Sequence, residues 1–155
     1  MSDGANVFIS HIHEDDAYLA RMKKLLANRD FNIRDSSINE TRPNKAKSEE
    51  YIKHGILAPR IRWAGTVVVL ISPHTSDSDY VKWEIDYAKQ HDTRIVGIYA
   101  PNADGCDLPE GLEDYADSIV PWNGDKLLAA VRGDDIWEDE RGRTRAKRDI
   151  ARFGC

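Results

Sequence analysis

The sequence predicts an α/β protein: a flavodoxin-like three-layer sandwich with a five-stranded parallel sheet. Five short apolar segments alternate with segments of helical periodicity, and this alternation is typical of parallel sheets with helices on both faces. The segment Thr66–Ile71 (TVVVLI) is a continuous β-branched run, as expected for a strand that is buried on both of its faces. Five strands in 155 residues fit the strand order 2-1-3-4-5.

Apolar runs and turn residues place each element along the chain. The expected strands are Asn6–Ser10, Phe31–Arg34, Thr66–Ile71, Thr93–Tyr99 and Ser118–Val120. The expected helices are Ala17–Arg29, Ser48–Arg62, one that starts near Ser78, a short one within Pro109–Ala116, and Gly124–Arg132. Asp15 and Asp16 suit the first turn of the first helix. Pro59 predicts a kink or break near Ala58 in the second helix.

The helix after the central strand carries the most informative side chain. Its apolar positions Val81, Ile85 and Ala88 form one stripe that faces the core. Glu84 lies only about 40–60° from that stripe around the helix axis. A carboxylate at the margin of a buried stripe is partly desolvated, which costs free energy unless something compensates.

Composition and charge exclude several classes of protein. The net charge of −5 gives no reason to expect nucleic-acid binding. No apolar run approaches the roughly 20 residues that span a bilayer, and no secretory signal is expected, so membrane binding is not predicted. Two cysteines, Cys106 and Cys155, indicate reduced thiols in a cytoplasm. His11 and His13 form a weak metal signal, and we expect no metal site.

The C-terminal stretch differs in composition from the rest. Residues 1–133 are expected to form one domain, and residues 134–155 a charged arm that packs on it or trails from it. This arm has acids up to Glu140 and then basic residues from Arg141. Such a charge split is more typical of a solvated, self-complementary surface than of a dedicated partner site.

Ligands of such sheets bind at the carboxyl ends of the strands. The side chains expected there include Ser10, His11, Ser36 and Ser72. Other functions of this fold class are disfavoured. A receiver domain needs an aspartate at the end of its third strand, where Ile71 and Ser72 stand. The acidic loop His11–Asp16 would repel the phosphate of a flavodoxin cofactor, and the glycine-rich nucleotide motifs are absent.

The remaining pattern resembles a TIR domain, most closely the bacterial TIR-like domains of ThsB type from the Thoeris anti-phage system. Three stretches carry the resemblance: Val7–His11 followed by Glu14 and Asp15, then VVVLISPHTSDSDYVKWEIDYA at Val67–Ala88, then Arg94–Tyr99. The resemblance covers roughly Asn6–Arg132. It also implies that Ser36–Lys47 is the loop between the second strand and the second helix, which we expect to be mobile until ligand or self-association orders it.

This resemblance implies an enzyme that cleaves the bond between nicotinamide and ribose in NAD⁺, with Glu84 as the catalytic glutamate. NAD⁺ is then the substrate, and no further cofactor is expected. The implied product is a cyclic or otherwise modified ADP-ribose signal that reaches a downstream effector. The resemblance also implies a homo-oligomer on activation. Substrate contacts are expected from Ser10, His11, Ser36, Ser72, Tyr80 and Trp83.

Two other functions remain open at this stage. One is a non-catalytic TIR module that only assembles with partners, and the intact Glu84 favours the enzyme over it. The other is a nucleoside deoxyribosyltransferase-like enzyme, which also uses a glutamate on a related fold. Release of nicotinamide from NAD⁺ separates the three functions.

Overall fold

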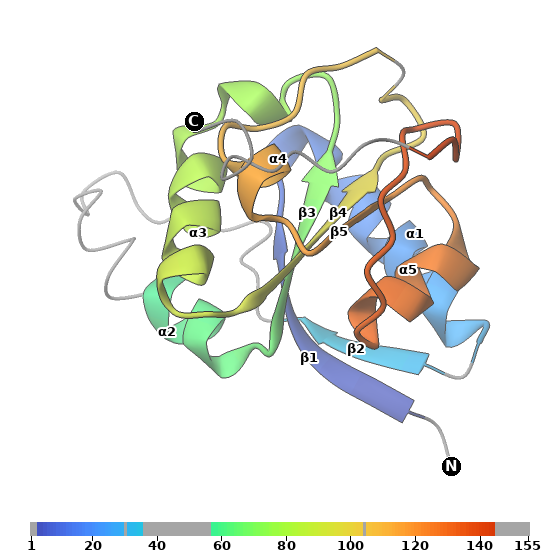
Figure 1. The fold of residues 1–155 in the computed structure, drawn as a ribbon. Coiled ribbons are helices and arrows are strands. Elements are labelled where there is room, and N and C mark those ends of the chain that lie inside the picture. The colour runs from blue at the N-terminus through green and yellow to red at the C-terminus, as the bar shows by residue number, and fades with distance from the viewer. Residues whose placement is uncertain (1–2, 30, 36–56, 104, 145–155) are drawn as a thin grey trace.

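The computed structural model describes residues 3–29, 31–35, 57–103 and 105–144 (Figure 1). It has an α/β fold with a parallel sheet and helices around it, which confirms the predicted class. The strands are β1 (Asp3–Ser10), β2 (Phe31–Asp35), β3 (Thr66–Ile71), β4 (Arg94–Tyr99) and β5 (Ser118–Val120). Every neighbouring pair is parallel, and the order across the sheet is β2-β1-β3-β4-β5.

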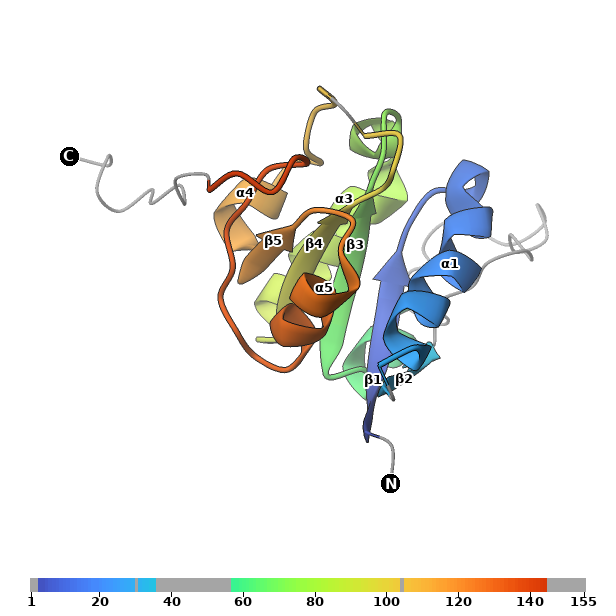
Figure 2. The same cartoon turned by 90° about the vertical axis from the view of Figure 1, so that its right-hand side faces the viewer.

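Helices cover both faces of the sheet. They are α1 (Asp16–Ala27), α2 (Ala58–Trp63), α3 (Asp79–Gln90), α4 (Leu112–Tyr115) and α5 (Gly124–Val131). Two short 3₁₀ helices, η1 (His13–Asp15) and η3 (Thr75–Asp77), precede α1 and α3. In Figure 2, α1 and α5 lie on the side of the sheet toward the viewer, whereas α3 lies behind it. The core residues of α2, α3 and α4 belong to one buried cluster, and those of α1 and α5 belong to another.

Strand β3 contributes to both clusters. Val67 and Val69 pack on the side of α2, α3 and α4, whereas Val68 and Leu70 pack on the side of α1 and α5. All six residues of the strand are buried. This two-sided burial explains why the run shows no alternation of apolar and polar residues.

The boundaries of some elements differ from the sequence-based expectation. Strand β1 begins at Asp3 rather than Asn6, because it pairs with β2 from Asp3 onward. The added residues have no apolar pattern, so periodicity does not reveal them. The first helix ends at Ala27 rather than Arg29. Pro59 lies in the first turn of α2, where a missing N–H costs little. Residues 36–56, which include most of the predicted second helix and its preceding loop, lie outside the described residues.

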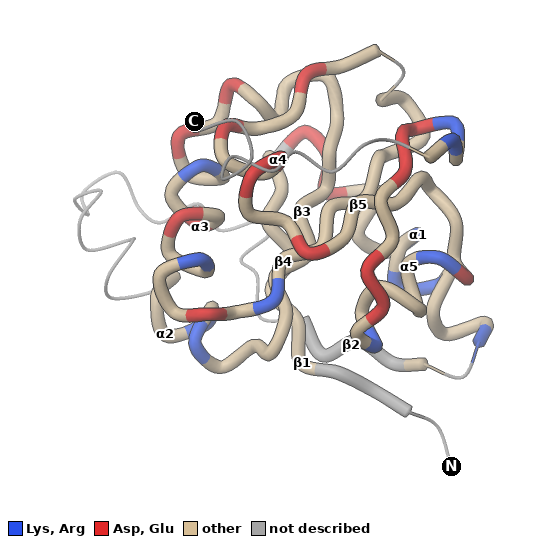
Figure 3. Tube along the Cα trace, viewed as in Figure 1, with Lys and Arg blue, Asp and Glu red and all other residues tan. Residues whose placement is uncertain are grey.

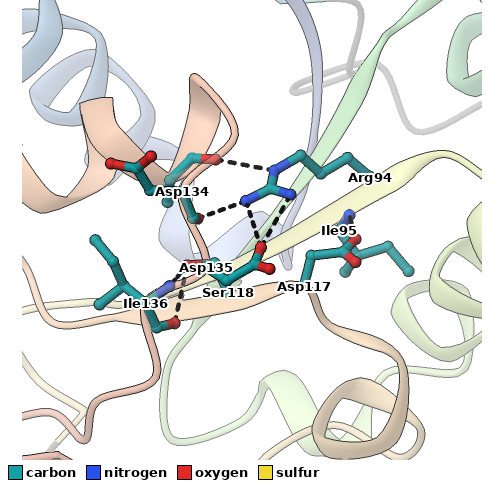
Figure 4. Close-up of polar contacts among 8 residues, drawn as sticks. Arg94, Ile95, Asp117, Ser118, Asp134, Asp135 and Ile136 are labelled. Carbon is teal, nitrogen blue, oxygen red and sulfur yellow. Dashed lines mark hydrogen bonds and ion pairs between the residues drawn. The ribbon is translucent and has the colours of Figure 1, made fainter.

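The segment after α5 packs along β5. The backbone N–H of Ile119 donates to the carbonyl of Ile136 at 2.8 Å, and that of Glu138 donates to the carbonyl of Ile119 at 2.9 Å. The hydroxyl of Ser118 and the backbone of Ile136 also exchange hydrogen bonds at 2.8 Å (Figure 4). The first residues of the predicted arm therefore extend the hydrogen bonding of the sheet.

Arg94 fastens this segment to the domain. Its Nε donates to the carbonyl of Ala130 at 2.9 Å and its Nη2 to the carbonyl of Asp134 at 2.6 Å. The same guanidinium lies 3.3 Å from the carboxylate of Asp135 (Figure 4). One side chain at the start of β4 thus joins the end of α5 to the segment beside β5.

Replacing Arg94 with alanine is expected to loosen this segment. We expect the variant to lose about 1–3 kcal/mol of stability, the usual range for hydrogen bonds to a charged group. The amides of Ile136 and Glu138 should exchange with solvent faster, whereas those of β3 should keep their relative protection. Hydrogen exchange followed by mass spectrometry checks this result. The matched control is Arg62→Ala, which removes an exposed arginine of α2. Equal exchange in both variants would contradict the anchoring role.

Candidate functional site

The polar ends of two neighbouring strands meet at the carboxyl edge of the sheet. Strand β1 ends at Ser10, and Ser72 directly follows β3, which pairs with β1. The loop from His11 to α1 and the start of α3 border the same edge. This is the place where parallel sheets bind ligands.

Glu84 lies next to the end of β1 at this edge of the sheet. Only 6% of its surface is exposed, and the hydroxyl of fully buried Ser10 donates a hydrogen bond to Glu84 Oε1 at 2.6 Å. A bond of this length to a carboxylate is charge-assisted and compensates part of the desolvation. The side chain of Glu84 projects from helix α3. The Ser78 hydroxyl fixes where this helix begins, since it caps the N-terminus by accepting a hydrogen bond from the Val81 N–H.

His11 is buried by internal contacts. Its Nδ1 lies 3.0 Å from the carbonyl of Ile9, and its Nε2 lies 2.7 Å from Oδ1 of Asp16. Both ring nitrogens thus contact oxygen atoms of the chain, one on β1 and one on α1. The structure shows His11 holding the loop after β1 in place. Its contact with a ligand stays a prediction.

Ser72 connects this loop to the end of β3. Its hydroxyl lies 2.5 Å from Oδ2 of Asp15 and 2.9 Å from the hydroxyl of Thr75. The Thr75 hydroxyl in turn donates to the carbonyl of Leu70 at 3.0 Å. Asp15, Ser72 and Thr75 are all buried, with at most 4% of each exposed. Desolvation by burial raises the pKa of the Asp15 carboxyl, although the hydrogen bond from Ser72 works in the opposite direction.

The aromatic residues of α3 lie beside Glu84 in sequence. Tyr80 and Trp83 are half-buried and pack against the core cluster on their side of the sheet. The Trp83 ring stacks on Tyr87 at a centroid distance of 5.1 Å, and Tyr87 also contacts the His91 ring at 4.1 Å. The arrangement holds Trp83 within an aromatic row along α3. Ser36, the remaining predicted contact residue, lies outside the described residues.

Hollows of different sizes lie near this edge of the sheet. One has a volume of about 330 Å³ and is lined by Ile12, Glu14, His74, Asp77 and Ser78. A larger one, of about 870 Å³, has the lining residues Ser76, Lys82, Tyr99, Cys106, Asp107, Leu108, Pro109, Glu110, Gly111, Glu113, Asp114, Asp139 and Glu140. Glu84 lines neither of them. Acidic positions outnumber basic ones along these lining segments (Figure 3).

The comparison with protein families decides the identity of the domain. Residues 8–104 match the family described as Thoeris protein ThsB, TIR-like domain. The chain belongs to this ThsB TIR-like family. The matched range contains Ser10, Ser72 and Glu84, and it ends before β5 and the segment packed on it.

Other comparisons add little to this ThsB TIR-like domain. No curated protein matches the chain. Among solved structures, one similar chain is described as a conserved protein from Enterococcus faecalis V583, with 13% sequence identity and a TM-score of 0.47. The alignment covers 63% of this chain and 64% of that one, which is less than two thirds of the solved chain.

Metal clusters and membrane spans are not found in the part of the chain that the structure describes. Within those ranges, no group of three or more His, Cys, Asp or Glu residues is arranged to hold a metal ion. No helix in the same ranges has the length and apolar character needed to cross a lipid bilayer.

Sequence reasoning misses the structural role of Asp15, Asp16 and Thr75. It places the two aspartates in the first turn of α1 as favourable charges. The structure has Asp16 in that first turn and Asp15 at the N-cap, and it also directs Asp15 to Ser72 and Asp16 to His11. The predicted strand order is the one signal that could have revealed these contacts. It makes β1 and β3 neighbours, so the loop after β1 and the residues after β3 lie side by side. Polar side chains in those two places are therefore expected to lie close together.

Proposed function

We propose that this ThsB TIR-like domain cleaves NAD⁺ between nicotinamide and ribose, with Glu84 as the catalytic residue. The observation that carries the proposal is the buried Glu84 carboxylate at the carboxyl edge of the sheet, held by Ser10 at 2.6 Å. Membership of the family supports the same activity, because TIR-like domains often cleave NAD⁺.

The chemistry suits a single carboxylate. Nicotinamide in NAD⁺ is already cationic and leaves without protonation by a general acid. The ribose then gains positive charge, as in the oxocarbenium-like transition state of glycoside hydrolysis. An oriented carboxylate in a partly desolvated site stabilises that charge more than it stabilises the ground state. Ser10 contributes by fixing the direction of the carboxylate before substrate binds.

The same proposal assigns the surrounding residues. Tyr80 and Trp83 offer aromatic surface for a base, while His11 and Ser72 border the site at the strand ends. Ser36 is proposed as a further contact. NAD⁺ is the substrate, and no separate cofactor is invoked. If water is kept from the sugar while adenine attacks it, the product is a cyclic ADP-ribose; otherwise it is ADP-ribose or another derivative.

The product is proposed to act as a signal in bacterial anti-phage defence and to be read by a downstream effector in the cytoplasm. Active protein is proposed to be a homo-oligomer. The direct test is to incubate the full chain at high concentration with NAD⁺ and to separate the products by chromatography. Release of nicotinamide supports the proposal. An absence of nicotinamide at every protein concentration would instead favour a non-catalytic interaction module.

A further inference from the structure

Asp15 is a second buried carboxyl group at the site, and the proposed chemistry does not use it. It lies at the end of η1, between β1 and α1, and only 4% of its surface is exposed. Its Oδ2 is 2.5 Å from the Ser72 hydroxyl. The contact joins the loop after β1 to the residue that directly follows β3.

Each hydroxyl hydrogen of the groups next to Asp15 can be assigned to an acceptor. The Thr75 hydroxyl has one hydrogen, which it donates to the carbonyl of Leu70 at 3.0 Å. It accepts the N–H of Ser72 at 2.9 Å, and the Ser72 hydroxyl lies 2.9 Å from it. A threonine hydroxyl has one donor and two acceptor sites, so it completes its set only if the Ser72 hydroxyl donates to it.

The protonation of Asp15 decides where the Ser72 hydrogen points. If Asp15 is ionised, the Ser72 hydroxyl must donate to it, and the 2.9 Å contact between Ser72 and Thr75 then holds a hydrogen only if Thr75 turns its own away from the Leu70 carbonyl. If Asp15 is protonated, it donates to Ser72, Ser72 donates to Thr75, and Thr75 donates to Leu70. Each contact in the row then has one hydrogen, and all of these buried groups are satisfied.

We infer that Asp15 is a positioning residue that carries a proton in the resting protein, and that this proton completes a hydrogen-bonded row from the loop after β1 to the end of β3. The row fixes the loop that directly follows Ser10, the residue that orients Glu84. The effect on catalysis rests on the proposed function, whereas the proton on Asp15 does not. Loss of the proton would loosen the loop and misalign Ser10.

The charged groups around Asp15 are mixed. The neighbouring residues Glu14 and Asp16 disfavour a negative charge on Asp15, whereas His11 favours it. On the facing side, His74 directly before η3 and Asp77 within it form an exposed pair, with Nδ1 and Oδ2 3.5 Å apart. Burial is the largest influence and raises the pKa of Asp15 from its ordinary value of 3.8.

The raised pKa of Asp15 determines how the stability of the fold changes with pH. The folded state binds the proton of Asp15 more tightly than the unfolded state does, because its folded pKa is the higher one. The contribution of Asp15 to stability is therefore full below pH 3.8 and is lost as the pH rises through the folded pKa. The variant Asp15→Asn should lack this part of the pH dependence, because its side-chain amide keeps a donor toward Ser72 without titrating.

The test measures the proton directly and then its effect. The Asp15 carboxyl is assigned by ¹³C NMR from the spectrum of Asp15→Asn and is titrated in the full chain. We expect the Asp15 carboxyl to remain protonated at neutral pH, with its midpoint above the ordinary 3.8, and an Asp15 carboxyl that is ionised at neutral pH would overturn the inference. Urea unfolding across the same pH range should show the wild type losing stability relative to Asp15→Asn as the pH rises. The control Asp92→Asn makes the same change at an exposed residue and should leave that pH dependence in place.

Kinetics separate a positioning role from a merely structural one. We expect Asp15→Ala and Ser72→Ala to lower kcat for nicotinamide release by about 10- to 100-fold with little change in KM, since small misplacements of catalytic groups have effects of that size. Asp15→Asn should restore kcat to within about threefold of the wild type and flatten the pH profile. Equal losses in Asp15→Asn and Asp15→Ala would overturn the positioning role. If the wild type releases no nicotinamide, the proposed function fails while the titration still decides the state of Asp15.

Discussion

The variant Glu84→Gln is expected to release nicotinamide from NAD⁺ at least about a hundredfold more slowly than the wild type, the scale of effect seen when an electrostatic stabiliser is removed from an active site. Glutamine keeps the shape of the side chain, and its carbonyl can still accept from Ser10. Only the negative charge that faces the developing positive sugar is lost. Because the Ser10 contact and the packing of α3 remain, the fold should be preserved.

The matched control is Asp92→Asn, which also replaces a carboxylate with its amide, at an exposed residue that lines neither hollow. Its rate should equal that of the wild type. Circular dichroism and thermal unfolding should show that both variants are folded. If Glu84→Gln is folded and cleaves NAD⁺ at the wild-type rate, Glu84 is not the catalytic residue.

The rate of nicotinamide release per subunit is expected to depend on protein concentration. If two copies form the active site, each tenfold dilution below the dissociation constant lowers the fraction assembled, and hence the rate per subunit, about tenfold. Initial rates over a dilution series, with light scattering in parallel, check this. A rate per subunit that is high and constant from dilute monomer upward would contradict assembly.

The charge of the hollows described above supports this expectation. Their linings carry many carboxylates, among them Glu14, Asp77 and Glu110, which repel the diphosphate of NAD⁺. We propose that a second copy supplies a wall that excludes water from the site.

A mixing experiment sharpens the test. Folded Glu84→Gln protein has no catalytic carboxylate of its own, but it keeps the surface that would complete a neighbour's site. Added in excess to dilute wild-type protein, it should therefore raise the rate per wild-type subunit. An unrelated protein at the same concentration serves as the control. No increase would show that the second copy does not complete the site.

The strands are the most predictable part of the fold. The runs at Thr66–Ile71 and Ser118–Val120 are apolar throughout their interiors and end at polar or turn residues, so their bounds follow from composition alone. The start of β1 escapes prediction because Asp3 and Gly4 join the sheet through backbone pairing with β2, and such pairing leaves no mark on side-chain periodicity. The start of α3 is predictable because Ser78 is a strong N-cap residue.

The candidate site is only partly predictable. The burial of Glu84 follows from its angle to the apolar stripe of α3, since helical geometry is local. Its partner Ser10 is 74 residues away, and only the strand order brings the two together. The contact of Asp15 with Ser72 joins residues that are 57 positions apart. The position of Asp15 just before a helix already explains why an acidic residue stands there, so the sequence gives no reason to expect a distant partner. Local rules thus account for single residues better than for pairs.

The hydrogen bonds between β5 and residues 136–138 have a consequence for the behaviour of the protein in solution. An outer strand with unpaired N–H and C=O groups is a template on which other chains add strands and aggregate. Here Ile119 uses its N–H and C=O on Ile136 and Glu138, so that edge is already occupied from within the chain. A chain shortened at Gly133 would bare these groups and invite edge-to-edge aggregation, whereas one that retains residues through Thr144 would stay protected there.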